Sequence, residues 1–566
     1  MKKFKLFILS TILVLSLLTA TACSFNLPSL GGGSGSGEGE GGGGSTPPAN
    51  SPVITQVEGT QGLTYKIEKT NKGIQYAVCT GVEKGSTLTD IVIASHYQDV
   101  LVKEVKQAAF KGNTNIKSVK MVNAMEKIDF YAFQNCSSLE SVILPETLTK
   151  ISQNAFDGCE LLLNVCNDSK LDIKKGTTNH GSVGNYACNI YSSTSGAAGE
   201  YKSEGEFDVF AFSGNRFVLK YNGSSSVVNF PDNTTGIYKD AFKGNTKITE
   251  VNFPATITYI GKSAFADCTS LQKVTFAQNT QVSEFGVNAF YGCEALKEYN
   301  YNNTLEQYMN IDYADDYANP IRYANTIAIN GETLYYLSIP NNITVVKSFL
   351  FNYCESIRKI YIPASVETIE MYAFAYTGAE EISFVENAQL KTIGANSFAH
   401  SEKITELKFP ASVERLGVQS FTECNNLVKV TFANNNNLYR FDQKAFASCD
   451  KLEHFFVGHN SALKEVGDRC FSYCVKMKYF SFGNNSVLEK IESYAFQANR
   501  PLKSLYIPST CLTMGAWTFS GCFQTRETDD LQIYIDLPSR PLTWNEQFNS
   551  SKCDEWWGTP YPYIEE

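Results

Sequence analysis

Histidines and paired carboxylates are the residues of this sequence that acid–base or metal chemistry would use, and their spacing suits neither. Adjacent acids such as Glu380 and Glu381, or Asp315 and Asp316, face opposite ways on an extended strand. The sequence contains no GxSxG elbow, P-loop, HExxH motif or EF-hand loop. We therefore predict a protein that is not an enzyme and that has no catalytic residues, no metal site and no cofactor. The five histidines, of which only the last two are close in sequence, are His96, His180, His400, His454 and His459.

Cysteines are abundant, with sixteen in the chain, and nine of them stand three residues after a phenylalanine that recurs along the sequence. Zinc sites need CxxC pairs or interspersed histidines, and neither occurs. Since Asn, Ser or Thr fills the same place elsewhere, we interpret these cysteines as small structural residues at a turn. The alternative is a disulfide ladder, because cysteines on successive coils about 4.8 Å apart are within bonding reach. The nine are Cys136, Cys159, Cys268, Cys293, Cys354, Cys424, Cys449, Cys474 and Cys522.

The N-terminus has the pattern of a secretory signal. Three lysines precede an apolar run over residues 6–18, and small residues follow up to Cys23. This pattern predicts a signal peptide over residues 1–22. A cysteine directly after such a site resembles the bacterial lipobox, although Ala20 stands where leucine is more usual. The resemblance implies lipidation of Cys23 and anchoring in a membrane through its acyl chains; an ordinary signal peptide or an uncleaved anchor is the alternative.

Residues 23–52 are rich in Gly and Ser and predict a flexible tether, since they have almost nothing to bury. The whole chain carries a net charge of −10 and has no cluster of Lys or Arg beyond the leader. An acidic surface of this kind argues against nucleic acid as a partner and against binding to anionic lipid through charge.

A repeat in the sequence predicts the strands and turns that would position any functional site. Fourteen phenylalanines recur, and eleven of the thirteen intervals between them are 23, 24 or 25 residues. A period in this range indicates a solenoid, because each unit is too small to bury its own apolar face. We expect these residues to form the structural core of the repeat. They are Phe110, Phe133, Phe156, Phe242, Phe265, Phe290, Phe351, Phe374, Phe398, Phe421, Phe446, Phe471, Phe496 and Phe519.

Apolar residues also recur six, nine and eleven positions after each phenylalanine, as in Leu427, Val430 and Phe432 after Phe421. The apolar-x-apolar ending predicts a short strand with one buried face, and stacked units predict a parallel sheet. An Ile or Leu five residues before the phenylalanine predicts a return segment containing a short helical or 3₁₀ turn.

These repeats resemble the BspA-like class of bacterial leucine-rich repeats. The resemblance is carried by blocks such as AFQNCSSLESVILPETLTKISQNAFDGC and SIRKIYIPASVETIEMYAF, and it extends from about residue 60 to the end. It implies a right-handed leucine-rich-repeat solenoid of about fourteen or more coils, of the α/β type with short parallel strands and irregular or 3₁₀ return segments. It also implies a bacterial surface lipoprotein that adheres to host matrix proteins or to other cells.

Two stretches break the rhythm and divide the array. We interpret both as longer coils with small hairpins that continue the same core, the alternative being separate inserted domains. The predicted organisation is repeats over 53–165, an irregular insert over 166–235, repeats over 236–300, a second insert over 301–342, repeats over 343–525 and a C-terminal cap over 526–566.

The cap region contains Trp544, Trp556 and Trp557. Solenoids need an atypical last unit to cover the open end of the core, and we expect these tryptophans to do so. A carbohydrate-stacking patch is the alternative.

The outward face of the parallel sheet is the predicted binding face. The residue ten positions after each phenylalanine lies between two buried positions and should point outward. Large side chains there are candidate contacts, because aromatic residues are favoured as anchors; intrinsic strand propensity is the alternative explanation. The candidate ligand-contact residues are Ile143, Tyr361, Lys408, Phe456 and Tyr506.

The sequence therefore predicts a lipid-anchored extracytoplasmic protein, at the outer membrane if the host has one. Its predicted function is to bind an extracellular protein or another cell through an extended repeat face. The rival hypothesis is a glycan-capturing lipoprotein of a nutrient-uptake system, with the two inserts forming its site. An enzyme with its active site in the inserts is a third, weaker alternative. The oligomeric state is left open.

Overall fold

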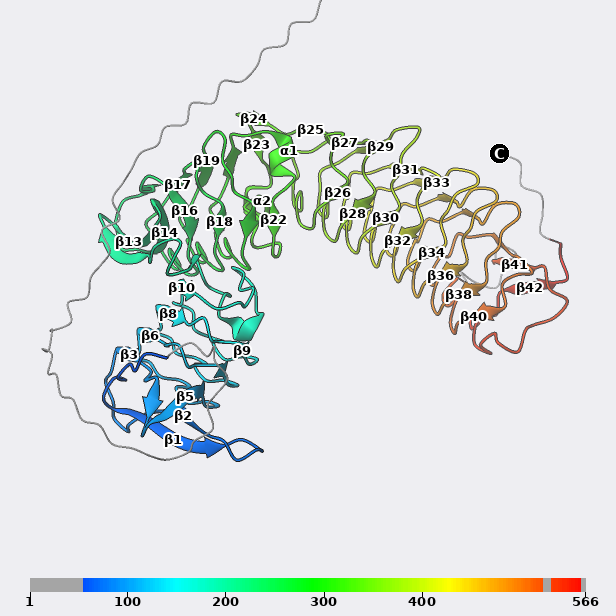
Figure 1. Cartoon of the computed structure of the whole chain (residues 1–566). Helices are drawn as coiled ribbons and strands as arrows, with labels where there is room; N and C mark the ends of the chain where they lie inside the picture. Colours follow the sequence, from blue (N-terminus) through cyan, green and yellow to red (C-terminus); the bar gives the residue numbers. More distant parts are fainter. Residues whose placement is uncertain (1–53, 523–530, 561–566) are drawn as a thin grey trace, which may run out of the picture. The chain divides into compact units, whose positions relative to one another are not determined.

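The computed structural model describes residues 54–522 and 531–560. The predicted signal peptide, the lipidation site at Cys23 and the tether lie outside the described residues. What is described is a solenoid of short strands with little helix, and its coils follow one another from β1 to β42 (Figure 1). The predicted leucine-rich-repeat solenoid is confirmed, and its coils outnumber the fourteen that the phenylalanines mark.

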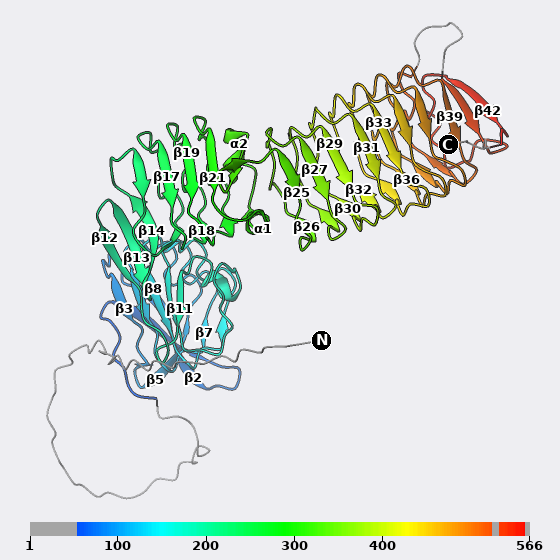
Figure 2. The same ribbon diagram turned by 90° about the horizontal axis from the view of Figure 1, so that it is seen from above.

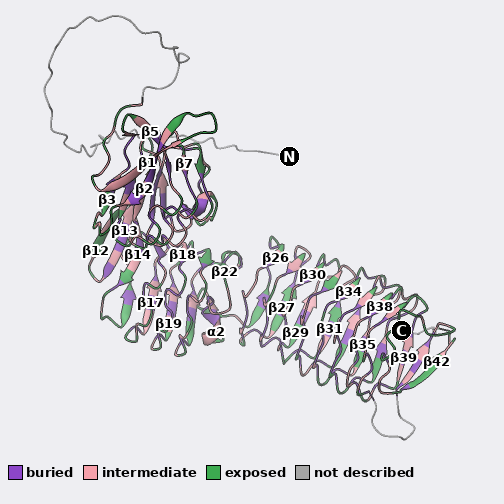
Figure 3. Ribbon diagram, turned by 90° about the horizontal axis from the view of Figure 1, so that it is seen from below, coloured by how far each residue is buried: buried purple, intermediate pink, exposed green. Residues whose placement is uncertain are grey.

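Each regular coil contains two strands, and most strands pair in parallel with their counterparts in the next coil; the longer strands β29 (Glu381–Phe384) and β31 (Glu406–Phe409), and β37 (Tyr479–Ser481) and β39 (Ser504–Ile507), are not paired. A strand of three or four residues alternates with one of two residues, as in β33 (Lys429–Phe432) followed by β34 (Arg440–Phe441). The longer strands lie side by side along one face of the array (Figure 2). Most of the longer strands bury every second residue, as β33 and β39 do, so their other residues face outward (Figure 3).

The longer strands form five sheets. In paired order they are β11 (Asn189–Tyr191), β10 (Asn164–Asn167), β8 (Ser141–Leu144), β6 (Ser118–Lys120) and β3 (Asp90–Val92); β15 (Val227–Asn229), β17 (Glu250–Phe253), β19 (Lys273–Phe276), β21 (Glu298–Tyr301), β23 (Ala328–Ile329) and β24 (Glu332–Thr333); β25 (Tyr336–Ser338), β27 (Lys359–Ile362) and β29 (Glu381–Phe384); β31 (Glu406–Phe409), β33, β35 (His454–Phe456) and β37 (Tyr479–Ser481); and β39 (Ser504–Ile507), β41 (Gln532–Ile535) and β42 (Asp554–Trp557).

The return strands form three further sheets. In paired order they are β1 (Leu63–Lys69), β2 (Gln75–Val82), β5 (Val100–Val105), β7 (Lys127–Ile128) and β9 (Lys150–Ile151), with β4 (His96–Tyr97) beside β5; β12 (Glu200–Glu204), β13 (Phe207–Phe212), β14 (Asn215–Tyr221), β16 (Thr234–Ile237), β18 (Tyr259–Ile260), β20 (Glu284–Phe285) and β22 (Asp312–Tyr313); and β26 (Val345–Val346), β28 (Thr368–Ile369), β30 (Thr392–Ile393), β32 (Arg415–Leu416), β34, β36 (Glu465–Val466), β38 (Lys490–Ile491) and β40 (Thr513–Met514).

All fourteen repeat phenylalanines are buried. Wherever the interval between two of them is 23 to 25 residues, their rings stack, with centroids 4.6 to 5.9 Å apart. The spacing of the rings follows the spacing of neighbouring strands, which is about 4.8 Å. The phenylalanines therefore form a continuous file of rings within each regular part of the array.

The return segment differs from the predicted helical or 3₁₀ turn. A two-residue strand is followed by tight turns in which the residues two before and two after every repeat phenylalanine have positive φ. Around Phe421, for example, Gln419 has φ 55° and Glu423 has φ 57°. This conformation points successive backbone N–H groups at the next coil, where Phe421 donates to the carbonyl of Ala445 at 2.8 Å. Hydrogen bonding between coils thus replaces the bonds that a helical turn would make within one coil.

The nine repeat cysteines are buried, and none of them forms a disulfide bond. In eight of the nine, the thiol donates a hydrogen bond of 3.0 to 3.3 Å to the carbonyl of the repeat phenylalanine in the preceding coil. Ser401 Oγ makes the same bond, to Phe374, at 3.2 Å. Cys354 is the exception, since its thiol lies 3.5 Å from Ser356 Oγ.

The first insert separates two core clusters, which differs from the expected single core. One cluster runs from Ala77 to Ala187, and the other begins at Phe207. Strands β9 and β11 end the preceding sheets, and the antiparallel strands β12, β13 and β14 begin the next one. An antiparallel ribbon does not continue the parallel ladder of the coil before it, so side chains connect the two parts of the array. A small hydrophobic cluster around Phe210 and Phe217 lies at this junction. The insert also contains the 3₁₀ turn η1 (His180–Ser182).

The second insert contributes to the same core cluster as the coils on either side. It contains the two α-helical turns α1 (Leu305–Tyr308) and α2 (Ile321–Ala324). The guanidinium of Arg322 lies 3.9 Å from the ring centroid of Tyr353 in the next regular coil. Insert and repeat are therefore packed together through side chains.

The C-terminal segment adds further coils to the array, because β41 and β42 extend the parallel sheet begun by β39. Trp544 is buried and Trp557 is half-buried against the core, as a cap requires. Trp556 was expected in the same role, and this expectation is wrong. Its side chain is 51% exposed, because it lies in register with the outward residue Tyr534.

Candidate functional site

The five predicted contact residues all lie on outward positions of the longer strands, but they do not form one site. Ile143 is half-buried on β8, Tyr361 is exposed on β27, and Lys408 is exposed on β31, where it pairs with Glu406 at 3.4 Å. Phe456 on β35 and Tyr506 on β39 are half-buried, and only these two line a common groove.

Aromatic side chains gather on the outward face from β35 to β42. The rings of Tyr506 and Tyr534 stack with centroids 4.6 Å apart, and Trp556 follows at 6.3 Å from Tyr534. On β35 and β37, the rings of His454 and Tyr479 stack with centroids 4.8 Å apart. We call these residues, together with Phe456, the aromatic face.

Sequence reasoning missed four members of the aromatic face, His454, Tyr479, Tyr534 and Trp556, as outward contacts. His454 and Tyr479 lie eight positions after their phenylalanines, and the same alternation that marks the tenth position also turns the eighth outward. That signal was present in the sequence. The outward positions of Tyr534 and Trp556 follow from strand pairing, of Tyr506 with Tyr534 and of Tyr534 with Trp556. These coils are not marked by a repeat phenylalanine.

A groove of about 700 Å³ lies on this face across β33, β35, β37 and β39. Phe456, Tyr479 and Tyr506 line it, together with Ser481, which pairs with Phe456 in the strand register, and Ser504, the first residue of β39. Partial burial raises the pKa of the Tyr506 phenol, so the ring stays neutral at physiological pH. The groove is therefore lined by aromatic rings and by two small serines.

Lysine and arginine side chains lie at and near the groove, and two of them are paired with carboxylates. The lining includes Lys429, whose Nζ lies 3.7 Å from Glu406 Oε1. The segments that lead into β37 and β39 add the exposed residues Lys476, Lys478, Arg500 and Lys503. Lys478 pairs with Glu453 at 3.0 Å, and that contact lowers the pKa of the Glu453 carboxyl.

Family comparison agrees with the repeat geometry. The model of the BspA type leucine rich repeat region matches residues 84–181, 215–315, 325–453 and 391–526, in six copies. The chain belongs to this family. No curated protein matches the sequence.

Solved structures similar to this BspA-type protein include bacterial leucine-rich repeat proteins. A leucine-rich repeat protein from Bacteroides ovatus is 18% identical, with 89% of this chain and 99% of that chain covered and a TM-score of 0.37. A leucine rich cell surface protein from Faecalibacterium prausnitzii is 20% identical, with 59% and 94% covered and a TM-score of 0.37. The pneumococcal vaccine antigen PcpA is 15% identical, with 72% and 95% covered and a TM-score of 0.28.

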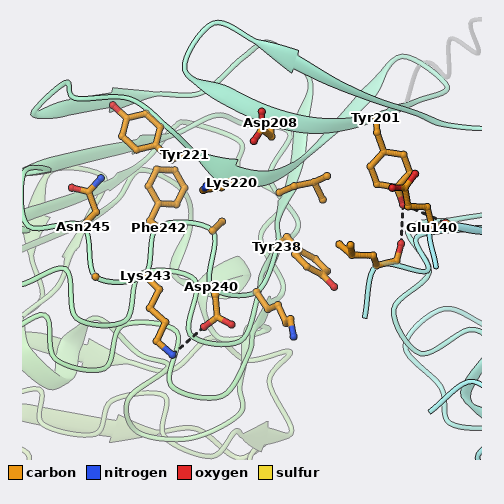
Figure 4. Close-up of a pocket in the computed structure, with 15 residues that line it drawn as sticks. Glu140, Tyr201, Asp208, Lys220, Tyr221, Tyr238, Asp240, Phe242, Lys243 and Asn245 are labelled. Carbon is orange, nitrogen blue, oxygen red and sulfur yellow. Dashed lines mark hydrogen bonds and ion pairs between the residues drawn. The ribbon is translucent and has the colours of Figure 1, made fainter. Parts of the chain in front are cut away.

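A second pocket, of about 590 Å³, lies where the first insert of this BspA-type chain joins the repeats (Figure 4). The Tyr201 hydroxyl donates to the carbonyl of Leu161 at 2.8 Å, and Asp240 pairs with Lys243 at 3.4 Å. Asp208 accepts hydrogen bonds from Ser203 and Asn222 at 2.7 and 2.8 Å. These polar groups already have partners, whereas the Tyr238 hydroxyl of the same lining is buried and makes no hydrogen bond to the described residues.

The residues that the structure describes in this BspA-type protein contain no group of three or more His, Cys, Asp or Glu that could hold a metal ion. Within the same residues, no helix is both long and apolar enough to cross a membrane. The lining of the groove offers ring contact and hydrogen bonding.

Proposed function

We propose that this protein is a cell-surface binding protein that recognises a macromolecular partner, a host matrix protein or another cell, through the outward face of its repeats. The observation that carries the proposal is the aromatic face. Solvated strands of the same array hold Asn252, Thr275 and Asn300 at outward positions, so the fold itself does not require rings there. Exposed rings at the centre of a contact surface supply most of the binding energy in protein recognition.

The proposal includes the predicted placement of the chain. A signal peptide ending at Cys23 and lipidation of that residue would hold the repeats outside the cytoplasm, with residues 23–52 as the spacer. Treating intact cells with a membrane-impermeant amine reagent should label the repeats. A Cys23→Ser variant should leave the membrane fraction, and retention of that variant would contradict the anchor.

The test of binding is a screen of the full chain against immobilised extracellular-matrix proteins, with a glycan array in parallel. We expect capture by at least one protein and weak or no capture by the glycans. The glycan-capturing alternative draws on the exposed indole of Trp556, since such a ring suits stacking on a sugar. Selective capture of glycans would favour that alternative, and turnover of any presented ligand would revive the enzyme hypothesis.

A further inference from the structure

The pocket of Figure 4 is assembled from three parts of the chain. Glu140 and Leu161 come from coils before the first insert, the lining residues between 201 and 221 come from β12, β13 and β14, and residues 238–245 belong to the first coil after the insert. The strands on the two sides of this junction share no ladder, because β11 ends one sheet and β12 begins another. Side chains therefore close the pocket, and ligand sites favour such junctions between separately packed parts.

The pocket has an apolar part that suits a small molecule. Tyr201, Tyr221 and Phe242 contribute rings to the lining, and Leu161 and Leu219 contribute aliphatic side chains. The volume, about 590 Å³, lies within the range of small-molecule sites. A molecule of one or two rings fits within this volume.

The charged side chains of the lining balance one another. Glu140 pairs with Lys117 at 3.5 Å, Lys239 pairs with Glu160, and Lys220 is exposed to solvent. A lining that is neutral in sum favours neither an anion nor a cation. The three carboxylates and three lysines are Glu140, Asp208 and Asp240, and Lys220, Lys239 and Lys243.

The Tyr238 hydroxyl is the buried polar group of the lining that lacks a partner. The residue is 8% exposed, and its hydroxyl makes no hydrogen bond to the described residues. It belongs to the small hydrophobic cluster that also contains Leu163, Cys188, Phe210 and Phe217. Burial raises the pKa of the Tyr238 phenol, so the hydroxyl stays protonated and can donate. A buried donor without an acceptor destabilises the fold, and a ligand that supplies an acceptor removes this cost.

The other polar groups of the lining are poorly suited to a sugar. Both carboxylate oxygens of Asp208 accept hydrogen bonds within the protein, and the Tyr221 hydroxyl donates to Glu206 at 3.0 Å. A pyranose needs several hydrogen-bonding partners for its hydroxyls. An apolar ligand with a single acceptor needs only the Tyr238 donor.

We infer that this pocket binds a neutral small molecule that has an aromatic body and one carbonyl oxygen, and that the carbonyl accepts a hydrogen bond from the Tyr238 hydroxyl. This is a second binding activity beyond the proposed function, because no residue of the pocket belongs to the aromatic face. In Figure 4 the Tyr238 ring stands between Asp240 and Glu140, so the ligand would lie at the junction. Because the hydroxyl is covered, side chains there must shift when the ligand enters, and no backbone ladder between β11 and β12 opposes this shift.

The decisive variant is Tyr238→Phe, which removes one oxygen and keeps the ring. Because that hydroxyl lacks a partner, the melting temperature of the variant should equal or exceed that of the parent. The matched control is Tyr301→Phe, since the Tyr301 hydroxyl is also buried without a partner among the described residues but does not line the pocket. A lower melting temperature for Tyr238→Phe would mean that its hydroxyl already has an acceptor, and the inference would fail.

The probes are three neutral aryl ketones, acetophenone, 2-acetonaphthone and benzophenone, measured by equilibrium dialysis against the full chain. Each is compared with the hydrocarbon of similar shape, which is ethylbenzene, 2-ethylnaphthalene or diphenylmethane. We expect at least one ketone to bind at least about threefold more tightly than its hydrocarbon, since a neutral hydrogen bond is worth a few-fold in affinity. Tyr238→Phe should abolish this difference and leave the affinity for the hydrocarbon unchanged, whereas Tyr301→Phe should change neither.

Several results would overturn the inference: no binding by any of the ketones, equal binding of ketone and hydrocarbon, a difference that survives in Tyr238→Phe or disappears in Tyr301→Phe, tighter binding of the anion 2-naphthoate than of 2-acetonaphthone, or displacement of the ketone by methyl glucoside. The proposed function is tested separately, because the screen for macromolecular capture does not involve the ketones. Failure of that screen leaves the pocket as it is, and failure of the ketones leaves the binding function as it is.

Discussion

The ring of Phe421 lies parallel to that of Phe446 in the next coil, with centroids 5.3 Å apart and planes inclined by 8°. Phe398 stacks on the opposite side of Phe421 at 5.2 Å. The Phe421 ring therefore packs against both neighbouring coils, and removing it affects the interface with each of them. Because a repeat array is stabilised by contacts between neighbouring coils, such a position should be among the most sensitive in the chain.

Replacing Phe421 by Ala should lower the free energy of unfolding by about 3 to 5 kcal/mol, since it removes a buried ring and leaves a cavity between stacked coils. Chemical denaturation would measure the loss, and hydrogen exchange should locate it in the coils that contain Phe398 and Phe446. Phe421→Leu is the control and should cost clearly less, because it keeps part of the volume. A change below 1 kcal/mol for the alanine variant would contradict the stacked core.

The Cys449 thiol donates a hydrogen bond of 3.1 Å to the carbonyl of Phe421. Cys449→Ser should be close to neutral, because Ser401 makes the same bond at the equivalent place. Cys449→Ala removes the donor from a buried carbonyl and should be about 1 to 2 kcal/mol less stable than the serine variant. Paired denaturation curves would measure the difference, and equal stability of the two variants would show that the thiol acts only through its volume.

Burial of the cysteine thiols predicts a loss of stability at alkaline pH. Burial raises the pKa of Cys424 and of Cys474 from 9.0 to about 12. A raised folded pKa means that the unfolded chain releases the proton first, so the stabilisation is complete below pH 9 and is lost as pH rises toward 12. Each thiol contributes at most about 1.4 kcal/mol per pH unit in this window.

Denaturation at pH 8, 9, 10 and 11 would measure this slope. The double variant Cys424→Ser, Cys474→Ser should lose stability less steeply than the parent, because two of the titrating groups are gone. The tyrosines and lysines titrate in both proteins, so the difference between the slopes isolates the thiols. Identical slopes would mean that these thiols ionise as easily in the folded chain as in the unfolded one.

The parallel stacking of coils could be predicted because it depends on side-chain volume at fixed intervals. Phenylalanine at one position, with leucine and valine six and nine residues later, leaves few other ways to bury the chain. The outward placement of Phe456 and Tyr506 followed from the same alternation. Tyr534 and Trp556 could not be placed, because their register comes from backbone pairing with β39 and no repeat residue marks it.

The turn around each phenylalanine could not be predicted, because the intrinsic backbone preference of its non-glycine residues is for negative φ. Glu423, Lys444 and Arg469 have positive φ, which side chains of this kind rarely adopt. Hydrogen bonds to the next coil hold them there, as in the 2.9 Å bond from Glu423 N–H to the Ala447 carbonyl. A sequence shows the preference of each residue but not the interaction between coils that overrides it.

This strained turn supplies a last prediction, at Ser448, two residues after Phe446, where φ is 57°. Five equivalent positions in other coils hold glycine, among them Gly158 and Gly292. Ser448→Gly should therefore be neutral or slightly stabilising, since relief of the left-handed conformation, about 1 to 2 kcal/mol, offsets the added chain entropy. Ser448→Val should lose at least about 1 kcal/mol, because a β-branched side chain is least compatible with this conformation. Thermal and chemical denaturation of the two variants would measure the difference. The left-handed backbone at Ser448 brings its N–H within 2.8 Å of the Ser472 carbonyl. A valine variant as stable as the glycine variant would mean that the turn does not hold this backbone conformation.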